Sequence, residues 1–163
     1  MKDKQSLLDG LAQAVTILSE FVATIPPDKM DLRRGEGFWT LNEHVSHLAD
    51  VQPMLYKRLE RFVAEAAPVF VPFMPDEDDQ ADSGPPNMPK DAALTQFADY
   101  RQRQLDLLEQ AESCTWQKTT NHPEYAHYSF YILVRHILMH DYWHMYRMEE
   151  LWLTHDEFLT ELK

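Results

Sequence analysis

One uninterrupted stretch, residues 127–152, constrains the fold more than any other part of the chain. It contains neither Pro nor Gly, and at about 1.5 Å per residue a helix of this length would cross a small domain. Its apolar residues, Leu133 and Ile137 among them, recur at helical spacing. His140 and His144 occupy the same stripe, so the sequence predicts an amphipathic helix with two imidazoles on its buried face.

The spacing of His140 and His144 has a chemical consequence. Residues four apart on a helix have Cβ atoms about 5–6 Å apart, and two imidazoles at that distance can bind one ion. A metal with one further ligand from elsewhere would explain their position on a buried face. A hydrogen-bonded pair of core histidines would also explain it, and the spacing alone does not decide between the two.

Three other segments share the helical spacing of apolar residues: 5–24, 41–66 and 90–113. Thr40 and Glu43 form a capping-box pattern before the second of these, with Trp39 placed to pack onto its first turn. Ser6 and Asp9 resemble a capping box in the first. No internal repeat and no alternating pattern typical of strands is evident. The sequence therefore predicts an all-α fold, an antiparallel four-helix bundle forming a single domain over residues 1–163.

Two connections in this predicted bundle are not short. Residues 67–89 combine Pro, Gly and acidic side chains, which excludes a helix, and their apolar first half could dock onto the bundle. Connections in bundles usually take about 2–8 residues, so a long loop is expected between helices two and three. Residues 114–126 are expected to form a second loop, and residues 154–163 could add a short final helix.

Charge and cysteine content exclude several classes of function. The formal net charge is −12 with pI near 5.0, so the overall field would repel nucleic acids and anionic membranes. The single cysteine excludes an internal disulfide and thiolate metal cages, and favours a reducing compartment. The N-terminal residues lack the apolar block of a signal peptide, and no run approaches the ~18 apolar residues of a spanning helix. We therefore expect a cytoplasmic protein.

Five of the eight histidines fall into two clusters on separate predicted helices: His44 and His47, then His136, His140 and His144. Three neutral imidazoles without a thiolate are the ligand set of an open zinc or nickel site, which leaves positions for water or substrate. A structural zinc site normally has four protein ligands. Spacing does not decide which histidine of residues 41–66 completes the set, and the apolar stripe alone favours His44.

Three short motifs give the chain a resemblance to a known family: Trp39-Thr40 with His47-Leu48-Ala49-Asp50, His122-Pro123-Glu124-Tyr125, and His140-Asp141-x-x-His144. Together with the order of helices and loops, they resemble the DinB/YfiT-like family of metal-dependent four-helix-bundle proteins. The resemblance implies a bundle, often dimeric, with one divalent metal held by His47, His140 and His144. His44 and His136 are then surplus, as second-shell donors or core residues.

The resemblance also implies a range of activities. Members with assigned roles include metal-dependent hydrolases, transferases of low-molecular-weight thiols and thiol-dependent isomerases. We therefore expect hydrolysis or thiol transfer on a small molecule, with Zn or Ni as the ion and a homodimer as the assembly. Asp50 and Asp141 are the candidate acid or base, and Asp141 could instead orient a histidine. The alternative is a bundle that binds metal or a small ligand, or dimerises, without turnover.

Overall fold

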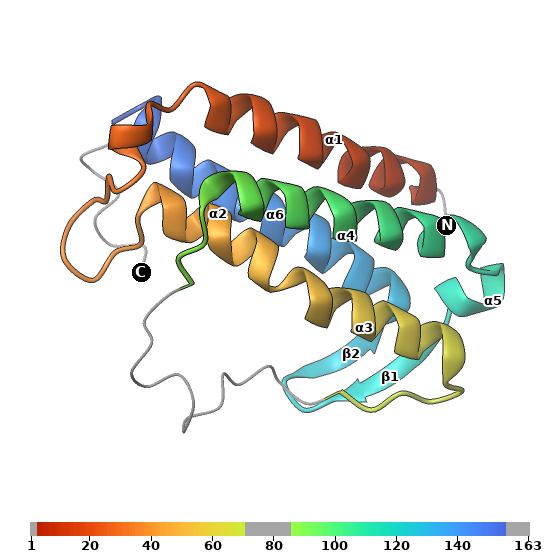
Figure 1. The fold of residues 1–163 in the computed structure, drawn as a ribbon. Helices are drawn as coiled ribbons and strands as arrows, with labels where there is room; N and C mark the ends of the chain where they lie inside the picture. Colours follow the sequence, from red (N-terminus) through yellow and green to blue (C-terminus); the bar gives the residue numbers. More distant parts are fainter. Residues whose placement is uncertain (1–2, 71–85, 156–163) are drawn as a thin grey trace.

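The computed structural model describes residues 3–70 and 86–155 (Figure 1). Its helices are α1 (Lys4–Ala23), the 3-10 turn η1 (Pro27–Lys29), α2 (Leu41–Asp50), α3 (Gln52–Ala64), α4 (Lys90–Gln110), α5 (Ser113–Trp116) and α6 (Phe130–Trp152). Two strands, β1 (Thr119–His122) and β2 (Tyr125–Ser129), form a hairpin. With α2 and α3 counted as one rod, the long helices form the predicted four-helix bundle.

The order of the rods around the bundle sets which of them face one another. α6 packs against α1, α2 and α3, and α4 packs against the same helices from the other side. α4 and α6 therefore lie at opposite corners. α4 runs antiparallel to α1 but in the same direction as α2 and α3 (Figure 1). The predicted antiparallel bundle thus contains parallel neighbours. α4 is parallel to α2 and α3, because α4 and α2 both begin at the same end of the bundle.

The second predicted helix, residues 41–66, is two helices in the structure. α2 ends at Asp50 and α3 begins at Gln52, with Val51 between them in a helical conformation (φ −76°, ψ −16°). Pro53 is the reason, because proline has no N–H to donate and its ring clashes with the carbonyl four residues earlier. The apolar face of the rod continues through the break.

The loop expected over residues 114–126 instead contains most of α5 and much of a β-hairpin that the sequence did not predict. β1 and β2 pair antiparallel, with Thr119 opposite Ser129 and Thr120 opposite Tyr128. Residues 127–129, predicted as the start of the last helix, belong to β2 instead, and α6 begins only at Phe130. Its N-cap is Ser129, whose hydroxyl accepts a hydrogen bond from the Ile132 N–H.

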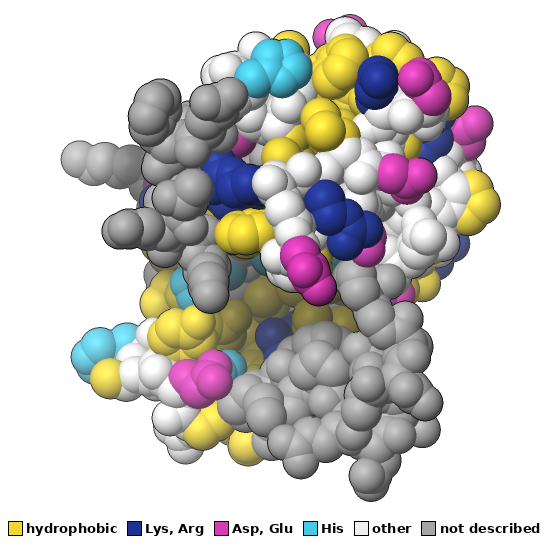
Figure 2. All heavy atoms as spheres, turned by 90° about the vertical axis from the view of Figure 1, so that its left-hand side faces the viewer, with side chains coloured by type: hydrophobic (Ala, Val, Ile, Leu, Met, Phe, Trp, Pro, Cys, Tyr) yellow, Lys and Arg dark blue, Asp and Glu magenta, His cyan; other side chains and the backbone are white. Residues whose placement is uncertain are grey.

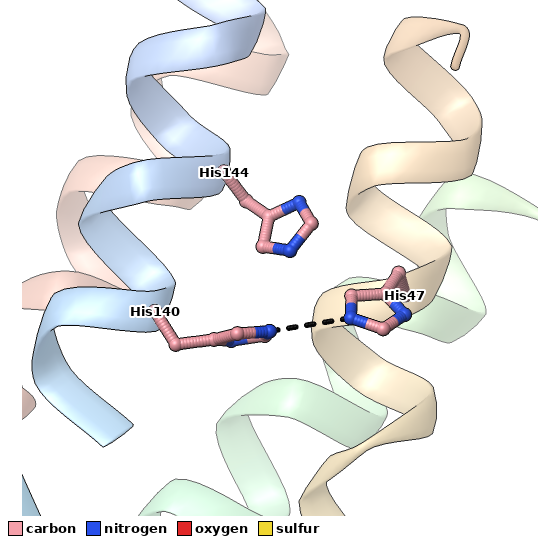
Figure 3. Close-up of side chains that lie close together, drawn as sticks. All are labelled: His47, His140 and His144. Carbon is pink, nitrogen blue, oxygen red and sulfur yellow. Dashed lines mark hydrogen bonds between the residues drawn. The ribbon is translucent and has the colours of Figure 1, made fainter. Parts of the chain in front are cut away.

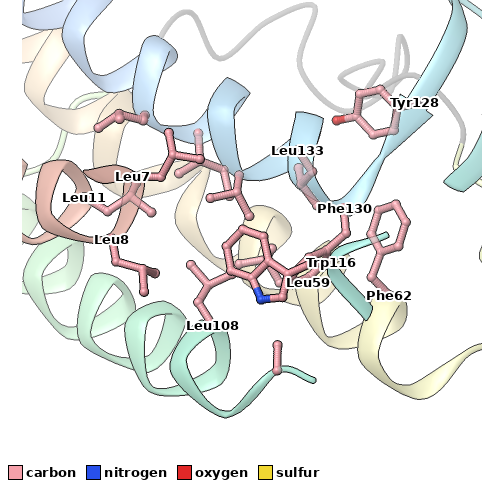
Figure 4. Packing of buried hydrophobic residues seen from close by; sticks show 14 of the residues in the cluster. Leu7, Leu8, Leu11, Leu59, Phe62, Leu108, Trp116, Tyr128, Phe130 and Leu133 are labelled. Carbon is pink, nitrogen blue, oxygen red and sulfur yellow. The ribbon is translucent and has the colours of Figure 1, made fainter. Parts of the chain in front are cut away.

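α1 begins at Lys4, so Ser6 lies inside it and the Ser6–Asp9 capping box predicted from sequence is wrong. By length and composition alone this helix could cross a membrane, although the sequence had suggested no such run. In the bundle its apolar stripe is part of the core instead. Leu11 contributes to a cluster around Phe62 and Phe130 (Figure 4). Leu18 contributes to a second core cluster.

The predicted docking of the long loop is tested only at its beginning. Phe70 is buried and joins the core cluster around Phe62, whereas Val69 is exposed. The other apolar residues of that prediction, and most of the predicted final helix, lie outside the described residues.

Candidate metal centre

Three histidines from two helices converge between α2 and α6. His47 comes from α2, and His140 and His144 come from successive turns of α6 (Figure 3). One ring nitrogen from each lies within 4.8 Å of the others. The Nε2 atoms of His47 and His140 are 3.2 Å apart. The structure therefore brings together the three residues that the family resemblance implied as ligands.

This arrangement fits a metal ion by two criteria. Zinc–nitrogen bonds of about 2.0–2.1 Å at tetrahedral angles place two ligand nitrogens about 3.3 Å apart, and the His47–His140 separation matches that distance. The donor set of three imidazoles, with no thiolate or carboxylate among them, suits a divalent transition ion and leaves a coordination position open. These residues would hold the ion through ring nitrogens that already face one another.

Burial keeps the three rings in the neutral form that binds a metal. Loss of solvation, and to a smaller extent the neighbouring histidines, lower the pKa of His140 to about 4 and that of His144 to about 2. The pKa of His47 is also lowered by burial, with Asp50 opposing the shift. At neutral pH no proton has to leave before an ion binds.

His44 is hydrogen-bonded to the cluster rather than part of it. Its Nδ1 lies 2.9 Å from Nδ1 of His144, and the ring is buried. With Nδ1 of His144 in this contact, its Nε2 is the nitrogen that would be left for an ion. This contact is the kind that fixes the orientation and tautomer of a metal ligand, and a second-shell role for His44 stays a prediction.

Trp39 covers the cluster from the loop that precedes α2. Its ring centroid lies 4.9 Å from that of His47 and 5.6 Å from that of His144. The predicted capping box holds this loop in place, since the Thr40 hydroxyl accepts from the Glu43 N–H and the Glu43 carboxylate accepts from the Thr40 N–H. The start of α2 therefore positions both His47 and the indole that shields it.

Comparison with known proteins now gives the family. The model of the DinB superfamily matches residues 11–155, a range that includes all three histidines. The chain belongs to the DinB superfamily.

Relatives of this DinB-superfamily chain carry names that refer to metals. Proteins of Oceanobacillus iheyensis and Bacillus mycoides, each named "Putative metal-dependent hydrolase", are 28% and 26% identical over 66% and 76% of this chain. The matches span 62% and 66% of those relatives' own lengths. YfiT from Bacillus subtilis, described as a probable metal-dependent hydrolase with an unusual four-helix bundle topology, superposes with a TM-score of 0.79. That match covers 93% of this chain and 86% of YfiT at 18% identity, and it supports the fold.

The two predicted acid or base candidates of this DinB-superfamily chain lie in different surroundings. Asp50, at the end of α2, is exposed. Asp141 is fully buried, and its Oδ2 accepts a hydrogen bond of 2.5 Å from the Arg101 guanidinium on α4. Burial raises the pKa of Asp141, and Arg101 opposes that shift. The geometry gives Asp141 a packing partner across the bundle, and a catalytic role for either residue stays a prediction.

His136 lies one turn before His140 on α6 but faces the hairpin. Its ring is exposed and sits 5.5 Å from Tyr125 and 5.6 Å from Tyr128, centroid to centroid. No hydrogen bond joins it to the three histidines within residues 3–70 and 86–155. Arg101 and Glu150 are buried charged residues that were not predicted from the sequence. For Arg101 the signal was a basic residue on the apolar stripe of residues 90–113.

Proposed function

We propose that this protein is a metal-dependent hydrolase in which His47, His140 and His144 hold one divalent transition ion. The observation that carries the proposal is the convergence of their ring nitrogens within 4.8 Å of one another, with His144 buried and His47 and His140 half-buried. An ion there would act as a Lewis acid that polarises a carbonyl and activates water. The names of the hydrolase relatives agree with this reaction class.

The surrounding residues prepare the site for that chemistry. His44 orients the His144 ring through the Nδ1–Nδ1 contact. The Trp39 ring packs against His47 and His144, and water kept from that side would strengthen electrostatic interactions at the cluster. Three protein ligands leave a position free, as catalytic zinc sites do. Zinc and nickel both accept three imidazoles, and we propose one of them as the native ion.

Metal analysis of untagged protein tests the ligand assignment. We expect about one divalent transition ion per chain, as a single three-ligand site requires. His140→Ala and His144→Ala should each abolish metal retention. His127→Ala is the matched control, because His127 is exposed on β2. Retention of metal by both ligand variants would show that the assignment is wrong.

Two other functions remain as alternatives to hydrolysis. A thiol transferase would join a low-molecular-weight thiol to an electrophile, and a non-catalytic module would only bind metal or dimerise. Esters and amides should be screened beside thiol–electrophile pairs on the metal-loaded protein. Turnover that is lost in His144→Ala while the fold persists supports an enzyme. Unfolding on metal removal, without any turnover, supports the module. A homodimer in the cytoplasm stays part of the proposal.

A further inference from the structure

A cavity of about 400 Å³ lies beside the histidine cluster and shares a wall with it. His44, which contacts Nδ1 of His144 at 2.9 Å, lines the cavity. So do Trp39 and Trp143, whose ring centroids lie 5.6 Å and 4.7 Å from that of His144. The volume falls in the range of about 300–1,000 Å³ that is typical of small-molecule sites. A molecule bound here would lie one side chain away from the cluster.

Large apolar side chains form one part of the cavity wall. Phe38 and Trp39 come from the loop before α2, and Trp143 and Leu151 come from α6. The loop turns at Gly37, whose φ of +80° is a conformation that side chains disfavour. The end of the molecule that carries this loop is hollowed, and hydrophobic side chains predominate in the hollow (Figure 2). Flat, apolar groups are therefore the best match to these walls.

The charged groups at the cavity balance one another. Arg34 and Arg147 line it, and so do Glu36 and Glu150. Arg147 forms an ion pair of 2.6 Å with Glu150, whose side chain is only 3% exposed. Two basic and two acidic side chains give the cavity no net formal charge. A strongly charged ligand would therefore gain little here, whereas polar atoms of an uncharged ligand could find both donors and acceptors.

We infer that this cavity binds the aromatic body of an uncharged ester or amide, with Trp143 as a specificity-determining residue. The inference rests on the proposed hydrolase function and names its substrate class. In the reaction, water adds to the carbonyl carbon and the ester C–O or amide C–N bond breaks. The products are a carboxylic acid and an alcohol or amine. The aromatic ring lies in the cavity, and the carbonyl extends past His44 toward the cluster.

The test compares two esters that differ only in the aromatic ring, methyl phenylacetate and methyl acetate, on the metal-loaded protein. Trp143→Ala should raise KM for methyl phenylacetate about tenfold and leave KM for methyl acetate unchanged, because only the first loses an aromatic contact. Trp143→Phe keeps an aromatic ring at this position, so its KM for methyl phenylacetate should return most of the way to that of the unsubstituted protein. Tyr146→Ala is the matched control. Tyr146 lies on the same helix and is 55% exposed, close to the 54% of Trp143, but of these two residues Trp143 alone lines the cavity.

A binding measurement separates failure of this inference from failure of the hydrolase proposal. Calorimetric titration with 2-phenylacetamide and acetamide should show tighter binding of the aromatic amide, weakened by Trp143→Ala. Such binding without hydrolysis of any ester or amide would support the cavity and overturn the hydrolase function. Hydrolysis of both esters with KM values that Trp143→Ala does not separate would overturn the cavity assignment alone. If the protein neither binds the aromatic amide nor hydrolyses either ester, both the cavity assignment and the hydrolase function are overturned.

Discussion

The buried pair of Arg101 and Asp141 allows a quantitative test of the packing that supports the site. Both side chains are 0% exposed, and Nη2 of Arg101 lies 2.5 Å from Oδ2 of Asp141 across the diagonal of the bundle. Arg101→Met removes the guanidinium charge and leaves the carboxylate of Asp141 buried without its partner. Removing one partner of such a pair costs about 3–5 kcal/mol of unfolding free energy. For a chain of this size that corresponds to a fall of about 6–20 °C in Tm.

Urea unfolding of the metal-free protein, followed by circular dichroism, measures this loss directly. Arg103→Met is the matched control, because Arg103 is exposed on the same helix, and it should change stability by no more than about 0.5 kcal/mol. The double variant Arg101→Met/Asp141→Leu should recover most of the loss, since a buried ion pair can often be replaced by apolar groups. A cost below about 1 kcal/mol for Arg101→Met alone would refute the reasoning.

Two further predictions concern the imidazoles. His44→Ala should weaken metal binding about 10–100-fold, because His144 loses the contact that orients it. His136→Ala, the control, should change the metal affinity little. Equal effects of the two variants in a metal-competition titration would contradict this. In the metal-free protein, the pKa of His44 and His140 is about 4 against 6.5 when unfolded. Between those values the unfolded chain binds more protons, so stability should fall as pH drops from 6.5 to 4. The free energy of unfolding should change by about 1.4 kcal/mol per pH unit for each ring. If urea titrations give the same free energy of unfolding across this pH range, the rings are not buried as described.

Features encoded by neighbouring residues were predictable from the sequence. The Thr40–Glu43 capping box is present as expected, because both of its hydrogen bonds join residues three positions apart. The four apolar stripes likewise predict the four rods of the bundle. The beginning of α6 was misplaced because the aromatic residues of β2 suit either a helix start or a strand. Only pairing with β1 decides between them.

Features that depend on distant partners were not predictable. The apolar stripe of residues 41–66 favoured His44 over His47, since a stripe indicates only the centre of a buried face. In the structure α2 contacts both α4 and α6, so a residue at the edge of that face, His47, still points to α6. Arg101 could not be interpreted either, because its carboxylate partner is 40 residues away in the chain.

The position of the three histidines along the chain has a further consequence for folding. His140 and His144 are neighbours in any helical segment, but His47 lies 93 residues before His140. An ion shared by all three would therefore join the two ends of a very long loop, in the manner of a removable cross-link. Closing a loop of that length restricts the unfolded chain most strongly. Metal supply would then set how long the folded chain persists, as well as what it can do.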